Sequence, residues 1–164
     1  MKRTLLFALA LIAVGCAEGE QEESASCADL SEEWAAAEDG MSPLEDVRSC
    51  AEHGDAVAQT NLGLMYMYGR GVPEDDAEAV RWYQLAAEQG YASAQFSLGF
   101  MYYSGEGVRQ DNVLAYMWLN LAAAQGNGFA RDHKEIVERQ MTREEIAEAE
   151  RMSREWLEAH PGGN

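Results

Sequence analysis

The sequence predicts an all-α protein: a short α-solenoid of antiparallel helix pairs with capping helices at its N- and C-terminal ends. Three observations carry this prediction. Proline is rare, at 3 of 164 residues, and alanine is frequent, which favours helix over sheet. A block of sequence recurs after 36 residues. Within each block, apolar residues recur at the spacing of one helix face.

The first 15 residues have the form of an export signal. Lys2 and Arg3 precede an apolar stretch, residues 4–15, that is too short to span a bilayer as a helix. The stretch runs into Ala-Val-Gly-Cys, which resembles a bacterial lipobox, so Cys16 is the expected lipidation site. The alternative is an ordinary secretory signal with an incidental cysteine. Because Ala17 follows rather than aspartate, resemblance to Gram-negative lipoproteins implies a lipid-anchored protein of the outer membrane, facing the periplasm.

The composition is strongly acidic, with 29 Asp and Glu against 12 Lys and Arg, a net charge of −17. Loss of Lys2 and Arg3 with the leader would take the charge to −19. Such a surface repels nucleic acid and anionic lipid, so nucleic acid is excluded as a partner and membrane contact is expected through the lipid anchor alone. Residues 16–26 comprise the lipidated cysteine and an acidic tether, and residues 27–164 form the expected repeat domain.

Two cysteines, Cys27 and Cys50, remain after lipidation. An even number in an oxidising compartment suggests a disulfide, and two buried free thiols are the alternative. A helix over residues 29–39 and a second that starts near Ser42 and runs to about His53 would form an antiparallel pair. This pairing would bring the start of the first helix, near Cys27, beside the end of the second.

Two full repeats are predicted, at about residues 55–90 and 91–126. The pattern Ala-Gln-x-x-Leu-Gly-x-Met-Tyr begins at Ala58 and again at Ala94, and a Gly-x-Gly-Val turn follows each copy. Gly63 and Gly99 are costly within helices, which indicates that a neighbouring helix packs too close for a side chain.

The second helix of each repeat is predicted to start after an aspartate, Asp75 or Asp111. Asp75 with Glu78 resembles a capping box. An inward stripe follows in the first repeat, formed by Ala79, Trp82, Tyr83 and Ala86.

Beyond residue 127 the repeat decays, although Ala130 keeps the register. Thr142 and Glu145 form a second capping box, which opens a final charged helix through Trp156. We interpret this helix as the polar cap that a solenoid requires at its end.

These motifs resemble the Sel1-like repeat, a relative of the tetratricopeptide repeat, over about residues 54–127. The resemblance implies an adaptor, for which we expect no cofactor and no enzymatic activity. Together with the expected lipid anchor, it predicts a membrane-anchored periplasmic protein that mediates protein–protein interaction through a helical-repeat groove. The alternative is an envelope ligand binder or enzyme that acts on β-lactam or peptidoglycan, because one cysteine-rich helical-repeat subgroup is associated with β-lactam binding. This chain lacks the cysteine pair in every repeat that marks the subgroup.

The resemblance to tetratricopeptide arrays also implies that the first helices of successive repeats line a concave face. The exposed positions of that face are the candidate partner-binding residues: Thr60, Leu64, Met67, Tyr68, Phe96, Phe100 and Tyr103. We expect a groove for an extended or helical peptide, anchored on the three aromatic residues of the second repeat. In the alternative interpretation, so short an array curls and these side chains pack against the terminal helices.

Catalytic and metal-binding patterns were not found in the sequence. His53, His133 and His160 fall in different elements without ligand spacing, and exposed helix ends explain them. Lys134 has Arg131 three residues before it, where a Ser-x-x-Lys motif would need the nucleophile. The sequence therefore predicts no catalytic residue and no metal site.

Overall fold

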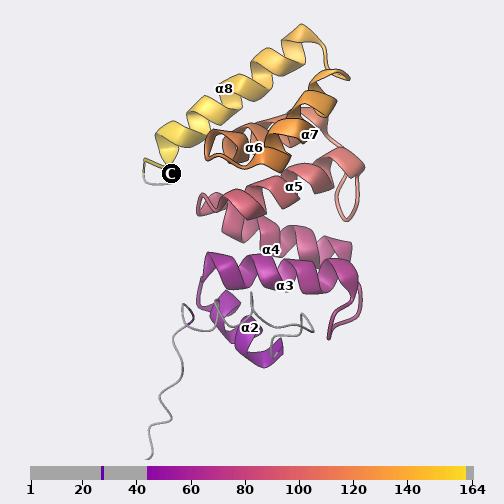
Figure 1. The fold of residues 1–164 in the computed structure, drawn as a ribbon, viewed down its shortest axis with the longest axis vertical. Coiled ribbons are helices and arrows are strands. Elements are labelled where there is room, and N and C mark those ends of the chain that lie inside the picture. The colour runs from indigo at the N-terminus through magenta and orange to yellow at the C-terminus, as the bar shows by residue number, and fades with distance from the viewer. Residues whose placement is uncertain (1–26, 28–43, 162–164) are drawn as a thin grey trace, which may run out of the picture.

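The structure is a computed structural model that describes Cys27 and residues 44–161 of the chain. Within these residues all regular secondary structure is helical. The helices are α2 (Leu44–Glu52), α3 (Ala56–Tyr68), α4 (Asp76–Glu88), α5 (Ala92–Ser104), α6 (Asn112–Ala124), α7 (Gly128–Glu138) and α8 (Arg143–Ala159) (Figure 1).

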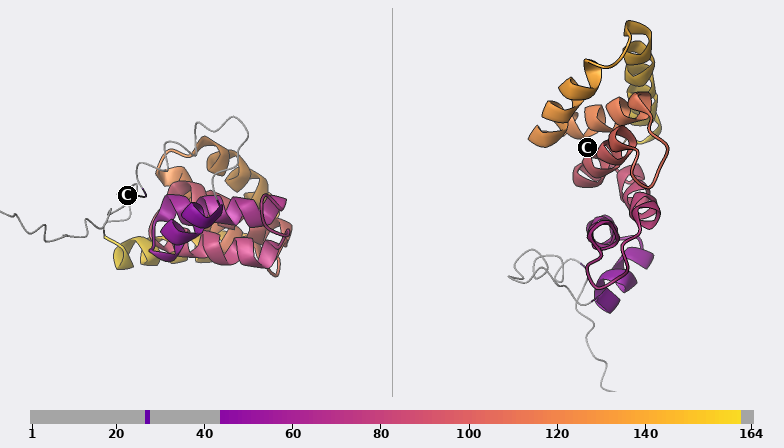
Figure 2. Two further views of the ribbon diagram at one scale, coloured as in Figure 1. Left: turned by 90° about the horizontal axis from the view of Figure 1, so that it is seen from below. Right: turned by 90° about the vertical axis from the view of Figure 1, so that its right-hand side faces the viewer.

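The helices stack in chain order along one axis, from α2 at one end to α8 at the other (Figure 1). Helices α3 and α4 form one pair, α5 and α6 the next, and each pair packs on the one before it. The side view in Figure 2 shows the resulting elongated stack. The prediction of an all-helical solenoid is confirmed.

The predicted helix starts are formed by side-chain caps. Asp75 and Asp111 each accept two backbone N–H groups of the helix that follows. Thr142 and Glu145 form the complete reciprocal capping box at the start of α8. At α4 only the aspartate half of the expected box is present among the described contacts, since Glu78 contributes its backbone N–H but no return bond.

The repeat register extends beyond the two full repeats. Ala58, Ala94 and Ala130 stand 36 residues apart, and each is fully buried, at 0 % exposed. Helix α7 therefore keeps the register of the first helix of a repeat, whereas α8 packs on α6 and does not form an equivalent pair with α7.

Gly63 and Gly99 mark the close approach of paired helices, as predicted. A Cβ atom at Gly63 would lie 2.6 Å from the ring of Tyr83 on α4. At Gly99 it would lie 2.8 Å from Leu119 on α6. Because these positions have no side chain, the two helices of each pair, α3 with α4 and α5 with α6, can touch.

A buried amide network recurs in both repeats and holds adjacent pairs together. The Gln95 side chain, at 0 % exposed, donates to the Ala87 carbonyl and accepts a 2.8 Å hydrogen bond from Gln125. Gln59 and Gln89 make the equivalent bond in the first repeat, at 2.7 Å. Because every buried amide needs a partner, this network fixes the register between neighbouring pairs.

The N-terminal end of the stack contains the predicted disulfide. Cys27 is bonded to Cys50 of α2, with their Cα atoms 5.7 Å apart. Cys50 is 4 % exposed and lies in the core between α2 and α3. The expected export signal, Cys16, the tether and the helix over residues 29–39 lie outside the described residues.

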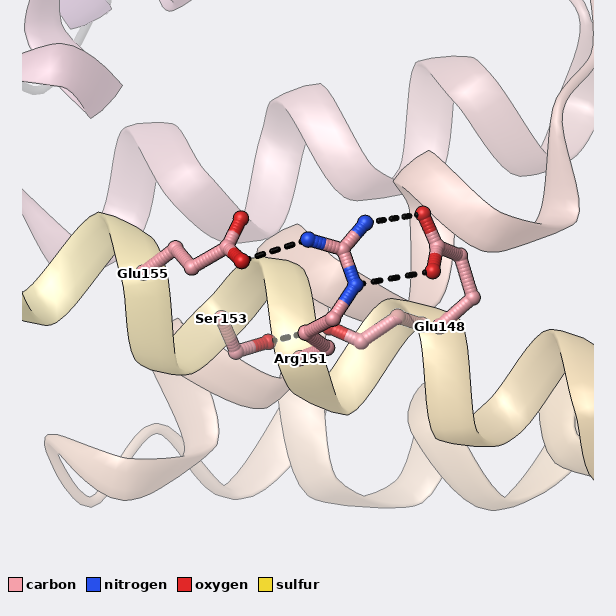
Figure 3. Close-up of polar contacts among 5 residues, drawn as sticks. Glu148, Arg151, Ser153 and Glu155 are labelled. Carbon is pink, nitrogen blue, oxygen red and sulfur yellow. Dashed lines mark hydrogen bonds and ion pairs between the residues drawn. The ribbon is translucent and has the colours of Figure 1, made fainter.

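Helix α8 covers α6 with a face that combines small buried residues and the larger, partly buried Met152, Trp156 and Leu157. Ala149 and Ser153 are buried, and the Ser153 hydroxyl donates to the Ala149 carbonyl at 2.9 Å and approaches the Met117 carbonyl of α6. On the opposite, exposed face, Arg151 pairs with Glu148 and Glu155 (Figure 3). The hydrogen bond from Arg151 lowers the pKa of Glu148, but exposed pairs of this kind contribute little to stability.

None of the helices in the described part of the chain combines the length and the apolar composition needed to cross a bilayer.

Candidate partner-binding groove

A groove opens on the side of the stack formed by the inner helices α3, α5 and α7. It encloses a cavity of about 240 Å³. Its lining is mostly apolar: Leu64, Met67 and Tyr68 from α3, Phe96, Ser97 and Phe100 from α5, and His133 from α7.

The composition of the inner helices explains the character of the groove. Helices α3 and α5 have 13 residues each, and neither contains Asp, Glu, Lys or Arg. In a chain that is 25 % charged, two uncharged helices side by side leave an apolar face toward solvent. A surface of this kind is typical of an interaction site.

Five of the seven candidate residues lie in this groove: Leu64, Met67, Tyr68, Phe96 and Phe100. Tyr68 is 56 % exposed, and the Arg70 guanidinium lies 5.2 Å from the centre of its ring at the rim of the groove. Phe100 projects from the middle of α5 toward the cavity.

Thr60 does not belong to the accessible face. It is 6 % exposed, and its hydroxyl donates to the Ala56 carbonyl of the same helix at 2.7 Å. The side chain is short and is satisfied by its own helix, so it does not reach the groove.

Helix α7 and the turn that follows it contact the aromatic residues of α5. The Phe96 ring centre lies 6.2 Å from that of Phe129, and the Tyr103 hydroxyl accepts a 2.9 Å hydrogen bond from Gln140. Tyr103 is not among the residues that line the cavity. The alternative, in which these side chains pack against the C-terminal part of the chain, therefore applies to Tyr103. Phe96 both packs against Phe129 and lines the groove, and Phe100 lines the groove.

His133 is a groove residue that the sequence interpretation missed. It does not lie at an exposed helix end but in the middle of α7, half-buried. Its ring meets those of Phe96 and Phe100 edge-on, at centroid distances of 5.3 Å and 5.8 Å. Its Nδ1 atom contacts the Phe129 carbonyl at 2.9 Å. The signal available in the sequence was the register, since His133 follows Ser97 by 36 residues.

Tyr83 supports the groove from below. It is fully buried, and its hydroxyl lies 3.6 Å from the Met67 sulfur, which it contacts as a donor. Burial raises the pKa of the Tyr83 phenol well above its usual value, so the ring stays neutral.

A second hollow, between α6 and α8, is polar and includes Asp111 and Glu145. Both carboxylates cap helix N-termini, where the macrodipole opposes a bound cation. Within the described residues, no three His, Cys, Asp or Glu side chains converge as a metal ion would require.

Comparison with known proteins gives a consistent result. The family model of the Sel1 repeat matches residues 56–91 and 92–127. A Sel1 repeat protein from Oxalobacter formigenes is 38 % identical, with a TM-score of 0.58, and the match covers 65 % of this chain and 83 % of that one.

A second solved structure is that of a protective antigen present in uropathogenic Escherichia coli strains, which displays an SLR fold. It is 32 % identical, with a TM-score of 0.77, over 83 % of this chain. The chain spans 31 % of the length of that antigen. No curated protein matches the chain in sequence.

Proposed function

Because the chain belongs to the Sel1 repeat family, whose members generally mediate protein–protein interaction and are typically non-enzymatic scaffolds, we propose that it is a membrane-anchored adaptor. It holds a partner protein in the groove between α3, α5 and α7. The observation that carries the proposal is the uncharged, open aromatic groove on a strongly acidic chain.

The proposed location rests on the sequence before the repeat domain. Acyl chains on Cys16 would hold the protein at the outer membrane, facing the periplasm, since each buried methylene contributes about 0.8 kcal/mol. The Cys27–Cys50 disulfide agrees with an oxidising compartment. The acidic tether would give the groove clearance from the lipid surface.

The test is a crosslinking pull-down of the lipidated protein from intact envelopes, with Phe100→Ala as the groove variant. Leu85→Ala is the matched control, because Leu85 is a large apolar residue, 40 % exposed, that lies on α4 outside the groove. Circular dichroism and thermal unfolding establish that both variants fold.

We expect a defined protein that is captured by the wild type and by Leu85→Ala and lost in Phe100→Ala. Capture that survives in a folded Phe100→Ala variant would contradict the assignment of the groove. Fractionation of the envelope, with Cys16→Ala as the variant, tests the anchor separately: we expect the variant to leave the membrane fraction.

A further inference from the structure

The repeat register arranges the inner face in two rows that cross α3, α5 and α7. One row is apolar: Leu64, Phe100 and Ile136 stand 36 residues apart on the three helices. Leu64 and Phe100 line the cavity, and Ile136 is 41 % exposed at the equivalent position of α7. A ligand that follows this row must run along the axis of the stack.

The neighbouring row is polar and uncharged. Asn61, Ser97 and His133 occupy equivalent positions at the same spacing, and the last two line the cavity. An amide, a hydroxyl and an imidazole can each donate and accept hydrogen bonds. With Nδ1 of His133 at the Phe129 carbonyl, its Nε2 atom is the nitrogen left for a ligand.

These two rows favour an extended chain over a helix. An extended peptide presents unpaired backbone N–H and C=O groups, whereas a helix has bonded its own. Packed helices lie about 10 Å apart, and three residues of an extended chain, at about 3.3 Å a residue, span the same distance. Apolar side chains at every third residue of an extended peptide would therefore each meet one inner helix.

Charge selects among extended peptides. Residues 44–161 contain 20 acidic and 10 basic residues, a net charge of −10, yet no carboxylate or cation lines the cavity. A charged anchor would lose its hydration there without gaining a partner. Basic residues beside the anchors would be attracted by the surrounding field, and acidic ones repelled. Arg70 is the cation at the rim, where it lies over the Tyr68 ring.

We propose that the occupant of the groove is an extended segment of a partner protein, with apolar side chains at every third residue and basic residues at its ends. The segment lies along the row formed by Leu64, Phe100 and Ile136, and its backbone bonds to the row formed by Asn61, Ser97 and His133. This proposal rests on the proposed adaptor function and specifies the chemistry of the partner.

Three fluorescent twelve-residue peptides test the proposal by anisotropy against the full lipidated protein in a non-ionic detergent. Each has Phe at every third position in a serine background, and the two ends carry Lys, Ser or Glu. We expect the Lys-ended peptide to bind at least about tenfold more tightly than the Glu-ended one at low salt, with a smaller ratio at about 0.5 M salt. Equal or tighter binding of the Glu-ended peptide would overturn the proposal.

Two further measurements separate groove binding from general attraction. Phe100→Ala should weaken the Lys-ended peptide at least about tenfold, and Leu85→Ala should leave it unchanged. N-methylation of two central amides of the peptide should weaken it at least about fivefold, because the polar row then loses its partners. An N-methylated peptide that binds undiminished would show that the backbone is not recognised.

The outcome also distinguishes the two proposals. If no peptide binds in a Phe100-dependent way but the envelope pull-down still captures a protein that Phe100→Ala loses, the partner chemistry is wrong and the adaptor function stands. If the pull-down fails as well, the groove is not the binding site and both proposals fall.

Discussion

The two full repeats share one backbone plan and differ most in their outer helices. Helix α4 carries four charged residues, whereas α6 in the equivalent position carries none. Leu85 of α4 is 40 % exposed, and its counterpart Leu121 on α6 is 2 % exposed. The cause is α8, which packs on the outer face of α6.

This difference shows that the composition of an outer helix depends on which other helices pack against it. An outer helix needs one apolar stripe toward its own inner helix, and α4 has that pattern. A helix that is apolar all round is buried on both sides, and α6 has that pattern instead. Position in the array therefore alters the composition of a repeat without altering its register.

The turns that join the two helices of each repeat also differ in what they pack against. Gly71 and Gly107 occupy equivalent positions with positive φ, at +72° and +65°. A Cβ atom at Gly71 would meet only the end of the Met65 side chain. At Gly107 it would collide with the backbone of Asp76, because this turn packs on the start of α4 in the preceding repeat.

The largest loss of stability is expected from a substitution that breaks this contact between the two repeats. Gly107→Ala should lower the free energy of unfolding by about 3 kcal/mol or more, because the left-handed conformation is strained and the backbone of Asp76 cannot move aside. Gly71→Ala, which meets only a flexible side chain, should cost about 1–2 kcal/mol. Urea unfolding of the two variants measures the difference. Equal losses would mean that the turn of the second repeat is not held against α4.

An intermediate effect is expected at the outer helices. Leu121→Ala leaves a cavity beneath α8 and should cost about 2–4 kcal/mol, whereas Leu85→Ala should cost less than about 1 kcal/mol. Thermal unfolding monitored by circular dichroism measures both. A loss at Leu85 that matched the loss at Leu121 would indicate that α4 is also covered.

The smallest effect on stability is expected at the residue that packs against the helix glycine of a repeat. Tyr83 packs against Gly63 in the first repeat, and Leu119 packs against Gly99 in the second. Burial raises the pKa of Tyr83 in the folded protein, so the unfolded chain ionises first. The stabilisation by neutral Tyr83 is complete below about pH 10 and is lost as the pH rises from there toward the folded-state pKa. Tyr83→Phe should therefore unfold less readily than wild type above about pH 10 and differ by less than about 1 kcal/mol at neutral pH.

Denaturant unfolding across this pH range tests the assignment to Tyr83. Tyr68→Phe removes an exposed phenol of the same type and serves as its control. A variant at Tyr68 that matched Tyr83→Phe in alkaline solution would assign the effect to phenols in general.

Local patterns were sufficient for most of the fold. The 36-residue period fixed the pairing of helices, the aspartate and threonine caps fixed their starts, and Gly63 and Gly99 indicated the close approach that the structure contains. For the groove, register transfer located five of the seven candidates, because equivalent positions of equivalent helices face the same way. These are Leu64, Met67, Tyr68, Phe96 and Phe100.

Where the sequence interpretation failed, long-range contacts were responsible. Tyr103 is engaged by Gln140, 37 residues further along the chain, and His133 enters the groove because α7 keeps the register of an inner helix. Thr60 failed for a local reason, a hydroxyl bonded within its own turn. Neither kind of contact is visible in a hydrophobic period.

The helices, their order and their repeat register follow from the amino-acid sequence alone, because propensity and capping act over a few residues and the 36-residue period can be found directly along the chain. Three features appear only once the chain has folded: α8 covers α6, α7 packs beside the aromatic residues of α5, and Phe100 still lines the cavity. Those outcomes depend on which surfaces meet across the stack, since the free energy of burial is gained only when two distant faces are brought together.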